Sequence, residues 1–504
     1  MPSFETGVRL LKNILIKKRS YSAFFADETD ALHKAFPAKA TVHAGPFGIP
    51  MLWNSARNFL EKKSFEPRQT DGIAYVHIPF CESRCLFCMF YQNPYASEAA
   101  DAYTNTLIKE FELWNQRAAQ NSAPIKALYF GGGTPTALEP HNIKKILDAV
   151  RTNLPLAEDC EITFEGRLHG LTDEKLSACV EGGVNRLSIG VQTFNADIRK
   201  EMQRLDSPEY IIRRLEKISA IDNLAVVIDL LFGFPGQKGK VWTDDLKIAS
   251  ELPIDGVDCY QLNVFEKSPL NTRIKSGLFD PAATLAEAAD MYAESVEHFS
   301  SHPNWHRLTN THWARTPLER NLYNRLAKGP SDCLPFGCGA GGKLFGYSWM
   351  QERKLAKWSE MVEKGLKPVF VMMKPQEHWH LMRTLASSVE SGPFNLKEIG
   401  DNFSVDIEKP LRPVMDQWVK AGLLDKSGDL FSPTVAGQFW HVTMAQLATE
   451  ALTMAISKED TFKADPITQS VYSPNQAEAW VNYRRLTAAA SLGRTPNSNG
   501  FRSP

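Results

Sequence analysis

Three of the chain's eight cysteines, Cys81, Cys85 and Cys88, lie within eight residues of one another. They directly follow the apolar run IAYVHI (residues 73–78), which predicts a buried strand. The spacing also suits one face of a helix, and free cysteine is often a core residue, which is the alternative interpretation. Three thiols so close together after a strand favour a shared metal centre. Because structural zinc and iron–sulfur sites normally take four protein ligands, three predict a centre with one position open for chemistry.

Most of the other cysteines are expected to be structural. Cys160, Cys179 and Cys259 lie within or beside apolar segments, so we expect them in the core. Cys338, inside a glycine-rich turn, is the rival candidate for a fourth ligand.

A glycine-rich turn follows the second apolar run, residues 125–130. It reads Gly131-Gly132-Gly133-Thr134, in which glycines let the backbone approach a ligand closely and Thr134 adds a hydroxyl group. A tight turn without a ligand is the equal alternative.

Charged and amide side chains stand near the ends of three later runs. Glu165 ends one run, Gln192 follows the next, and Asp229 lies inside the third, where an unpartnered carboxylate would be costly. Arg204, between the last two, is either part of the same group or a solvated helix residue. These positions are the predicted carboxyl ends of strands, the face on which (β/α) barrels build active sites.

The elements that must position these residues are six short apolar runs, at residues 73–78, 125–130, 160–165, 186–191, 224–232 and 257–262. The intervening stretches leave room for crossover helices, which predicts parallel βα units. We therefore expect an α/β fold, a partial (β/α)6 barrel, with a smaller and mostly helical C-terminal domain of winged-helix type. The predicted bounds are an N-terminal arm at 1–70, the barrel with an extension at 71–350, the C-terminal domain at 351–455 and a partly disordered tail at 456–504.

The composition excludes several classes of protein. The chain has 504 residues, of which 43% are hydrophobic, and its 57 basic and 58 acidic residues give a net charge of −1. Such a charge balance argues against a mainly electrostatic nucleic-acid binder. No apolar run approaches the ~18 residues of a membrane span, and the N-terminus does not read as a secretory signal. We expect a cytoplasmic protein with reduced thiols.

The C-x3-C-x2-C spacing, with the aromatic Phe87 before the last cysteine, resembles the radical S-adenosylmethionine (SAM) enzymes. This resemblance implies that Cys81, Cys85 and Cys88 hold a [4Fe–4S] cluster whose fourth iron binds the amino and carboxylate groups of SAM. It also implies that the reduced cluster breaks a C–S bond of SAM to give a 5′-deoxyadenosyl radical. The protein's own part is then to position and shield the cofactor.

Further motifs narrow the resemblance to one branch of that superfamily. YVHIPFC, YFGGGTPT, GGVNRLSIGVQTF, DLLFGFPGQ and YQLNVFE resemble the branch that contains oxygen-independent coproporphyrinogen III dehydrogenase, whose members can hold two SAM molecules. Carried over by motif, the residues expected at the cluster-bound SAM are Tyr75, Gly132 and Glu165. Those expected at the second SAM are Phe87, Gly133, Thr134, Gln192, Arg204 and Asp229. Ser268 and Lys343 are assigned as cofactor contacts by position alone.

Within this branch, CLFCMFYQN, TFEGR and the segment HWARTPLERNLYNRLAKG with PFGCGAGGKLFGYSWMQ resemble the anaerobilin synthase subfamily. That resemblance implies a radical methyltransferase that opens the haem macrocycle without oxygen, yields the methylated linear tetrapyrrole anaerobilin and releases iron. Haem would be the substrate, and a flavodoxin-type or other low-potential protein the electron donor. Two alternatives stay open: oxidative decarboxylation of coproporphyrinogen III, and a haem chaperone that passes haem on intact. The His-Asn segment of such chaperones is not recognisable here, where NLYNRL stands instead.

Contacts to haem are predicted from residue type only. His312, in the HWAR segment, is a candidate axial ligand of the haem iron and, with Tyr75, a candidate catalytic residue. A histidine hydrogen-bonded in packed surroundings is the more common case. Arg315 and Arg320 are candidate partners of the two propionates, because guanidinium suits carboxylates geometrically, with ordinary surface charge as the alternative.

Overall fold

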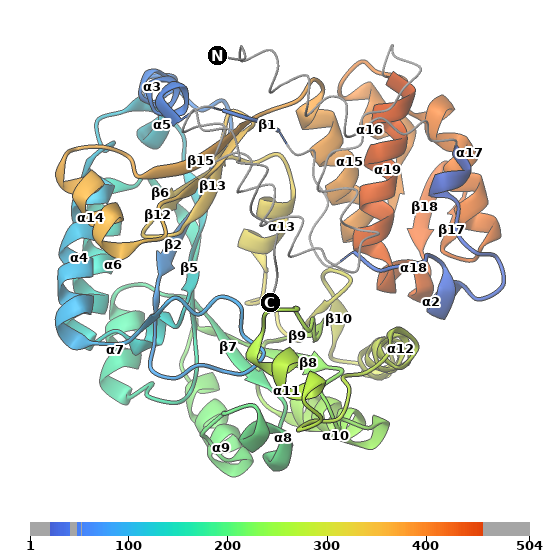
Figure 1. Cartoon of the computed structure of the whole chain (residues 1–504), viewed down its shortest axis with the longest axis horizontal. Helices are drawn as coiled ribbons and strands as arrows, with labels where there is room; N and C mark the ends of the chain where they lie inside the picture. Colours follow the sequence, from blue (N-terminus) through green and yellow to red (C-terminus); the bar gives the residue numbers. More distant parts are fainter. Residues whose placement is uncertain (1–20, 41–47, 52, 457–504) are drawn as a thin grey trace, which may run out of the picture.

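The computed structural model describes residues 21–40, 48–51 and 53–456. Its centre is a series of six parallel strands that coincide with the six predicted apolar runs (Figure 1). They are β2 (Gly72–Ile78), β5 (Ile125–Gly132), β6 (Leu156–Gly166), β7 (Arg186–Gln192), β8 (Ala225–Phe232) and β9 (Gly256–Gln261). Neighbouring members pair parallel to one another in this order, so their carboxyl ends share one rim.

Amphipathic helices connect these strands and cover their outer face. The crossover helices are α4 (Ser97–Glu112), α5 (Ala118–Asn121), α6 (Pro140–Asn153), α7 (Asp173–Glu181), α8 (Ala196–Glu201), α9 (Pro208–Ser219) and α10 (Gly239–Glu251), with the short η2 (Pro135–Ala137) after β5. After β9 come α11 (Pro269–Lys275) and α12 (Leu285–Ser301). Side chains alternate along each strand, so Tyr75 of β2 faces the inside of the barrel, the lumen, whereas Ala74 and Val76 pack in the core under the helices.

The sheet continues beyond the barrel at both edges, to 13 strands in all within the described residues. At one edge, β12 (Cys333–Phe336) pairs parallel to β2 and is followed by β13 (Gly341–Leu344), β14 (Tyr347–Gln351), β15 (Val369–Lys374) and β1 (Ile49–Pro50). At the other, β9 pairs with β11 (His312–Ala314), and β11 with β10 (His306–Arg307). Because β2 and β9 do not pair with each other, the barrel is partial, and the sheet runs on past the predicted boundary at residue 350. The helices α3 (Trp53–Lys63) and α14 (Leu355–Glu363) accompany this extension.

The amino end of the barrel is closed by the short helix α13 (Leu322–Lys328), which lies near the middle of the molecule (Figure 1). Its Leu322, Tyr323 and Leu326 pack against Ile73 and Cys333 at the beginnings of β2 and β12. The helix α13 therefore covers the amino end of the barrel.

The C-terminal domain consists of helices around a three-stranded antiparallel sheet with the order β16–β18–β17. Its elements are α15 (Trp379–Ser391), β16 (Phe394–Asn395), α16 (Leu396–Asp401), α17 (Glu408–Lys420), β17 (Leu424–Ser427), β18 (Leu430–Pro433), α18 (Val435–Phe439) and α19 (His441–Ile456). The helix, hairpin and helix predicted over 417–441 are thus present.

Two short N-terminal elements, η1 (Tyr21–Phe24) and α2 (Ala31–Lys34), lie beside this domain, although they are far from it in sequence (Figure 1). The buried indole of Trp418 donates to the Phe24 carbonyl at 2.9 Å, and that of Trp440 to the Ala31 carbonyl at 3.0 Å. This part of the predicted N-terminal arm is therefore packed against the C-terminal domain. The predicted tail, from residue 457 on, lies outside the described residues.

Candidate functional site

The three clustered cysteines occupy the loop that leaves β2 at the carboxyl rim. This loop is framed by a short parallel pair, β3 (Phe80–Cys81) and β4 (Asn93–Pro94). Cys81 and Cys85 are buried, and Cys88 is half-buried. Burial raises the pKa of Cys81 and Cys88 above the usual value, and the neighbouring cysteines add to this effect to a lesser degree.

Each of the three sulfur atoms has a different hydrogen-bond donor. Thr134 Oγ1 lies 3.4 Å from Cys81 Sγ, the Phe90 amide nitrogen 3.4 Å from Cys88 Sγ, and Arg167 Nη2 3.2 Å from Cys85 Sγ. Hydrogen-bond donors and cations of this kind favour the thiolate form that binds metals.

The chemistry of the donor set, three free thiols on one loop, fits an iron–sulfur cluster. Among the described residues, no three His, Cys, Asp or Glu side chains converge closely enough to hold one metal ion. In a [4Fe–4S] cluster each thiolate binds a different iron, so the sulfur atoms need not converge on one point. Three thiols on one loop, each with its own donor, match that requirement.

The rival ligand Cys338 has neighbours that differ from those of the cysteine loop. Its side chain has no exposed surface, and burial, with Glu352 and Glu110 nearby, raises the pKa of its thiol to about 12. Cys160, Cys179 and Cys259 are buried, as predicted, and all eight cysteines are free.

The glycine-rich turn after β5 is packed directly against the cysteine loop. The Gly133 amide donates to the Ile78 carbonyl at 2.8 Å, and the Thr134 amide to the Phe80 carbonyl at 2.7 Å. Gly132 has φ +115°, and a Cβ atom there would lie 2.6 Å from the His77 ring. The close approach of the two loops therefore requires glycine, which adds a packing role to the proposed ligand role of this turn.

The lumen beneath the loops contains two partly buried carboxylates on different strands. Burial, followed by the charge of Asp229, raises the pKa of Glu165 on β6 to about 8. Burial and the neighbouring Asp258 likewise raise the pKa of Asp229 on β8 above its usual range. Tyr75, also partly buried in the lumen, has a pKa raised by desolvation and by Glu165. The phenol bonds to His77 Nδ1 at 3.0 Å.

Gln192 and Arg204 lie on the same rim. Gln192 ends β7 with φ +75° at a register shift opposite β8, a strained conformation of the kind found at ligand sites. Arg204 donates to the Gly190 carbonyl of β7, and its Nη1 lies 3.6 Å from Cys85 Sγ. The structure therefore brings these predicted residues together with the cysteine loop.

Three further predicted contacts have different surroundings. Phe87 packs edge-on against Phe234, with ring centroids 5.6 Å apart. The Ser268 hydroxyl is the N-cap of α11, which accepts from the Asn271 amide and donates to the Phe265 carbonyl. Lys343 on β13 lies opposite Cys333 at the amino end of the barrel, where its ammonium donates to the carbonyls of Ala327 and Gly329. Lys343 is therefore remote from the rim. Its pairing with Cys333 corrects its assignment as a cofactor contact, which was made by position alone.

The segment that holds His312, Arg315 and Arg320 also lies away from the rim. Both ring nitrogens of His312 face carboxylates, with Asp258 at 2.7 Å and Glu319 at 3.1 Å. Although burial opposes it, these partners raise the pKa of His312 to about 9, so the ring is a buried imidazolium. A protonated imidazole with no exposed surface is not available to a haem iron, which corrects the expectation of an axial ligand.

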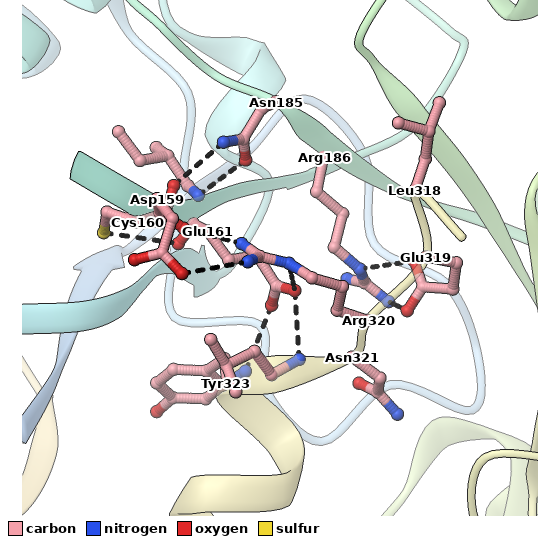
Figure 2. A network of polar contacts seen from close by, with 12 residues as sticks. Asp159, Cys160, Glu161, Asn185, Arg186, Leu318, Glu319, Arg320, Asn321 and Tyr323 are labelled. Carbon is pink, nitrogen blue, oxygen red and sulfur yellow. Dashed lines mark hydrogen bonds and ion pairs between the residues drawn. The ribbon is translucent and has the colours of Figure 1, made fainter. Parts of the chain in front are cut away.

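The two arginines bond to the protein itself. Arg315 donates to the Leu252 carbonyl at 2.8 Å, and Arg320 to the Asp159 carbonyl at 2.8 Å (Figure 2). The propionate contacts expected at Arg315 and Arg320 are therefore replaced by contacts that tie this segment to the barrel.

Figure 2 shows how this segment is anchored beneath the lumen. Arg186 of β7 makes two contacts with Glu319, at 2.8 and 3.1 Å, and both side chains are buried. The carboxylate of Glu161 accepts from the Leu322 and Tyr323 amides at 3.0 Å each, which satisfies the first turn of α13. This network lies at the amino end of the barrel and forms the floor of the lumen. Arg186, Glu319 and Glu161 were not predicted from the sequence because their partners are distant in sequence.

Arg167 is the missed residue nearest to the cysteines. It belongs to the TFEGR segment and follows the last residue of β6. A cation two residues after Glu165 at a strand end was the available signal.

Comparisons with known proteins agree with this arrangement. The model of the radical SAM superfamily matches residues 75–247. The chain is 42% identical over 417 residues to anaerobilin synthase of Escherichia coli O157:H7, covering 82% of this chain and 91% of that protein. It is 30% identical over 294 residues to the heme chaperone HemW of Bacillus subtilis (strain 168), covering 58% and 76% of the two chains.

The solved structure of coproporphyrinogen III oxidase (HemN) from Escherichia coli has the same fold, with a TM-score of 0.69, 21% identity and coverage of 84% of this chain and 99% of that one. The predicted partial barrel is thereby confirmed. No helix in the described part of the chain has the length and apolar character of a bilayer span. Radical SAM proteins use a [4Fe–4S] cluster and SAM, and the cysteine loop fits that requirement. The chain belongs to the radical SAM family that contains anaerobilin synthase.

Proposed function

We propose that this protein is a radical SAM methyltransferase that opens haem under anaerobic conditions, gives the methylated linear tetrapyrrole anaerobilin and releases iron. The observation that carries the proposal is the 42% identity to anaerobilin synthase over 91% of that enzyme's length. The resemblance reaches beyond the radical SAM core at residues 75–247, so it includes the parts that distinguish one member of the superfamily from another.

Cys81, Cys85 and Cys88 are the proposed cluster ligands, and the bound cluster would supply the electron that cleaves SAM. Their loop is anchored by the glycine-rich turn on one side and by α11 on the other, where the Leu270 amide donates to the Leu86 carbonyl at 3.1 Å. This rigid support is what positions a cofactor for selective chemistry.

The lumen carboxylates suit SAM because SAM carries a sulfonium and an ammonium group. Glu165 and Asp229 are partly buried, and desolvation raises their pKa values, so the cations of the protein alone do not fully stabilise the two ionised carboxylates. A cationic ligand beside them would favour their ionised forms. We assign Tyr75, Gly132 and Glu165 to the cluster-bound SAM.

A second SAM is proposed at the same rim. Its assigned contacts are Phe87, Gly133, Thr134, Gln192, Arg204 and Asp229. Gln192, Arg204 and Asp229 come from one neighbourhood, since Gly190, to which Arg204 donates, is the register partner of Asp229.

Haem would enter from the carboxyl rim, because α13 closes the opposite end of the barrel. The electron donor is proposed to be a flavodoxin-type or other low-potential protein. Free thiols at all eight cysteines suit the reducing cytoplasm.

The test is anaerobic incubation of the reconstituted protein with haem, SAM and a low-potential reductant, followed by mass spectrometry of the tetrapyrrole. The expected product is an opened macrocycle that carries one additional methyl group derived from isotopically labelled SAM. A parallel incubation with coproporphyrinogen III is expected to release no CO2. Decarboxylation of that substrate, with haem unaltered, would refute the proposal.

Haem transfer without chemistry is the second candidate, because the chain covers 76% of HemW at 30% identity. In place of the chaperones' His-Asn segment, residues 321–326 form the floor of the barrel. Recovery of intact haem on an acceptor protein, with no SAM consumed, would favour the chaperone function.

A further inference from the structure

Arg167 bridges two residues of the cysteine loop. One guanidinium nitrogen, Nη1, donates to Ser83 Oγ at 3.0 Å, and the other, Nη2, lies 3.2 Å from Cys85 Sγ. Neither the motif assignment of SAM contacts nor the proposed ligand set gives this arginine a role.

The backbone around Arg167 fixes the direction of its side chain. Its amide donates to Thr136 Oγ1 at 3.2 Å, which ties the end of β6 to the turn after β5. Three residues later, a Cβ atom at Gly170 would lie 2.9 Å from the Glu82 carboxylate, so this turn packs directly on the cysteine loop. Arg167 is therefore held against the loop by both neighbouring segments.

The three thiols differ in the charge of their donors. Cys81 faces a hydroxyl group and Cys88 a backbone amide, both neutral. Cys85 faces two guanidinium groups, Arg167 at 3.2 Å and Arg204 at 3.6 Å. Charged donors form the stronger hydrogen bonds, and hydrogen bonds to the sulfur atoms, together with local charge, set the potential of an iron–sulfur cluster.

We propose that Arg167 is a positioning residue of the cluster: it orients Cys85 through Ser83 and raises the cluster's reduction potential. The physical reason is that reduction adds a negative charge to the cluster, which a cation on one ligand stabilises. The proposal rests on the ligand assignment made above. It gives the TFEGR segment a function, namely to ease the transfer of one electron from a low-potential donor.

The test compares Arg167→Gln, Arg167→Lys and the wild type, each reconstituted anaerobically as the full chain. Arg412→Gln is the matched control, since Arg412 pairs with Glu408 on the exposed side of α17. The reduced cluster is followed by EPR at controlled potentials without SAM, and iron content is measured for each sample.

Arg167→Gln is expected to disfavour reduction about tenfold, which for a one-electron couple is a shift of ~59 mV to more negative potential. Arg167→Lys keeps the positive charge but has one nitrogen atom where arginine donates through two, so an intermediate shift is expected. Arg412→Gln is expected to match the wild type.

A wild-type potential in Arg167→Gln at equal iron content would overturn the proposal. An unchanged potential with weakened SAM binding would also overturn it and would assign Arg167 to SAM. If Arg167→Gln retains no cluster, the equally neutral Arg167→Met takes its place, and a wild-type potential there refutes the electrostatic role. A wild type that assembles no cluster would refute the ligand assignment itself, and this inference with it.

Discussion

Replacing Glu165 by Gln should stabilise the cofactor-free protein, and increasingly so at higher pH. Burial and Asp229 raise the pKa of Glu165 to about 8, whereas the unfolded chain has a value near 4.5. Between these two values the folded protein keeps a proton that the unfolded chain releases. The wild type therefore loses stability as the pH rises from 4.5 to 8, and the glutamine variant lacks this loss.

The size of the effect follows from linkage. One proton contributes a slope of about 1.4 kcal/mol per pH unit, so about 2–3 kcal/mol should accumulate between pH 6 and pH 8. Urea unfolding of both proteins at the two pH values measures it as the change in their stability difference.

The control is Glu158→Gln, an exposed position on the same strand β6. It is expected to show no pH-dependent gain. If the stability difference between Glu165→Gln and the wild type were equal at pH 6 and pH 8, the pKa of Glu165 would not be raised in the cofactor-free protein. The argument for a cationic ligand at Glu165 would then fail.

Three further changes probe the loop, the rim and the floor. Single replacement of Cys81, Cys85 or Cys88 by Ala should abolish the cluster's visible absorbance, whereas Cys338→Ala should retain it; a fully loaded single variant of the loop would contradict the ligand set. Asp229→Asn should weaken binding of the second SAM in equilibrium dialysis and leave the cluster absorbance intact, and its loss would count against the placement of Asp229. Glu319→Gln leaves the buried Arg186 without its carboxylate and should cost about 3–5 kcal/mol of unfolding free energy. Glu360→Gln, in an exposed pair with Lys364, should cost no more than about 1 kcal/mol, and equal losses in the two variants would refute the buried pair.

The barrel strands were predictable because they are covered on both faces. Runs such as residues 225–232 are almost continuously apolar, and their spacing leaves room for one helix each. The cysteine loop was predictable for a related reason, since its three ligands are local in sequence. Both patterns can be recognised in a single sequence because neither depends on contacts between residues that are distant in the chain.

The floor could not be predicted in the same way. His312 and Arg320 are chemically suited to haem, yet their partners lie on strands 54 and 161 residues away in the chain, counting from Asp258 and Asp159. Lys343 was misplaced because one hairpin, β12 with β13, decides whether its side chain reaches the rim or the amino end. The position of Arg167 could not be predicted because it depends on the contact between two loops. Arg167 and its partner Ser83 are 84 residues apart in the chain.

The distribution of charge explains why the carboxyl end of the lumen, and not its floor, is the place for cationic cofactors. In the floor, Arg186 and the His312 imidazolium are matched by Glu319 and Asp258, so the buried charges balance. Above it, Glu165 and Asp229 remain with raised pKa values although Arg186, His312 and Arg204 already lower that of Asp229. Partly buried carboxylates in this condition are stabilised by any cation that reaches them, and α13 covers the amino end of the barrel. A ligand with a sulfonium and an ammonium group therefore meets its complementary charge beside the cysteine loop, where its bond is to be broken.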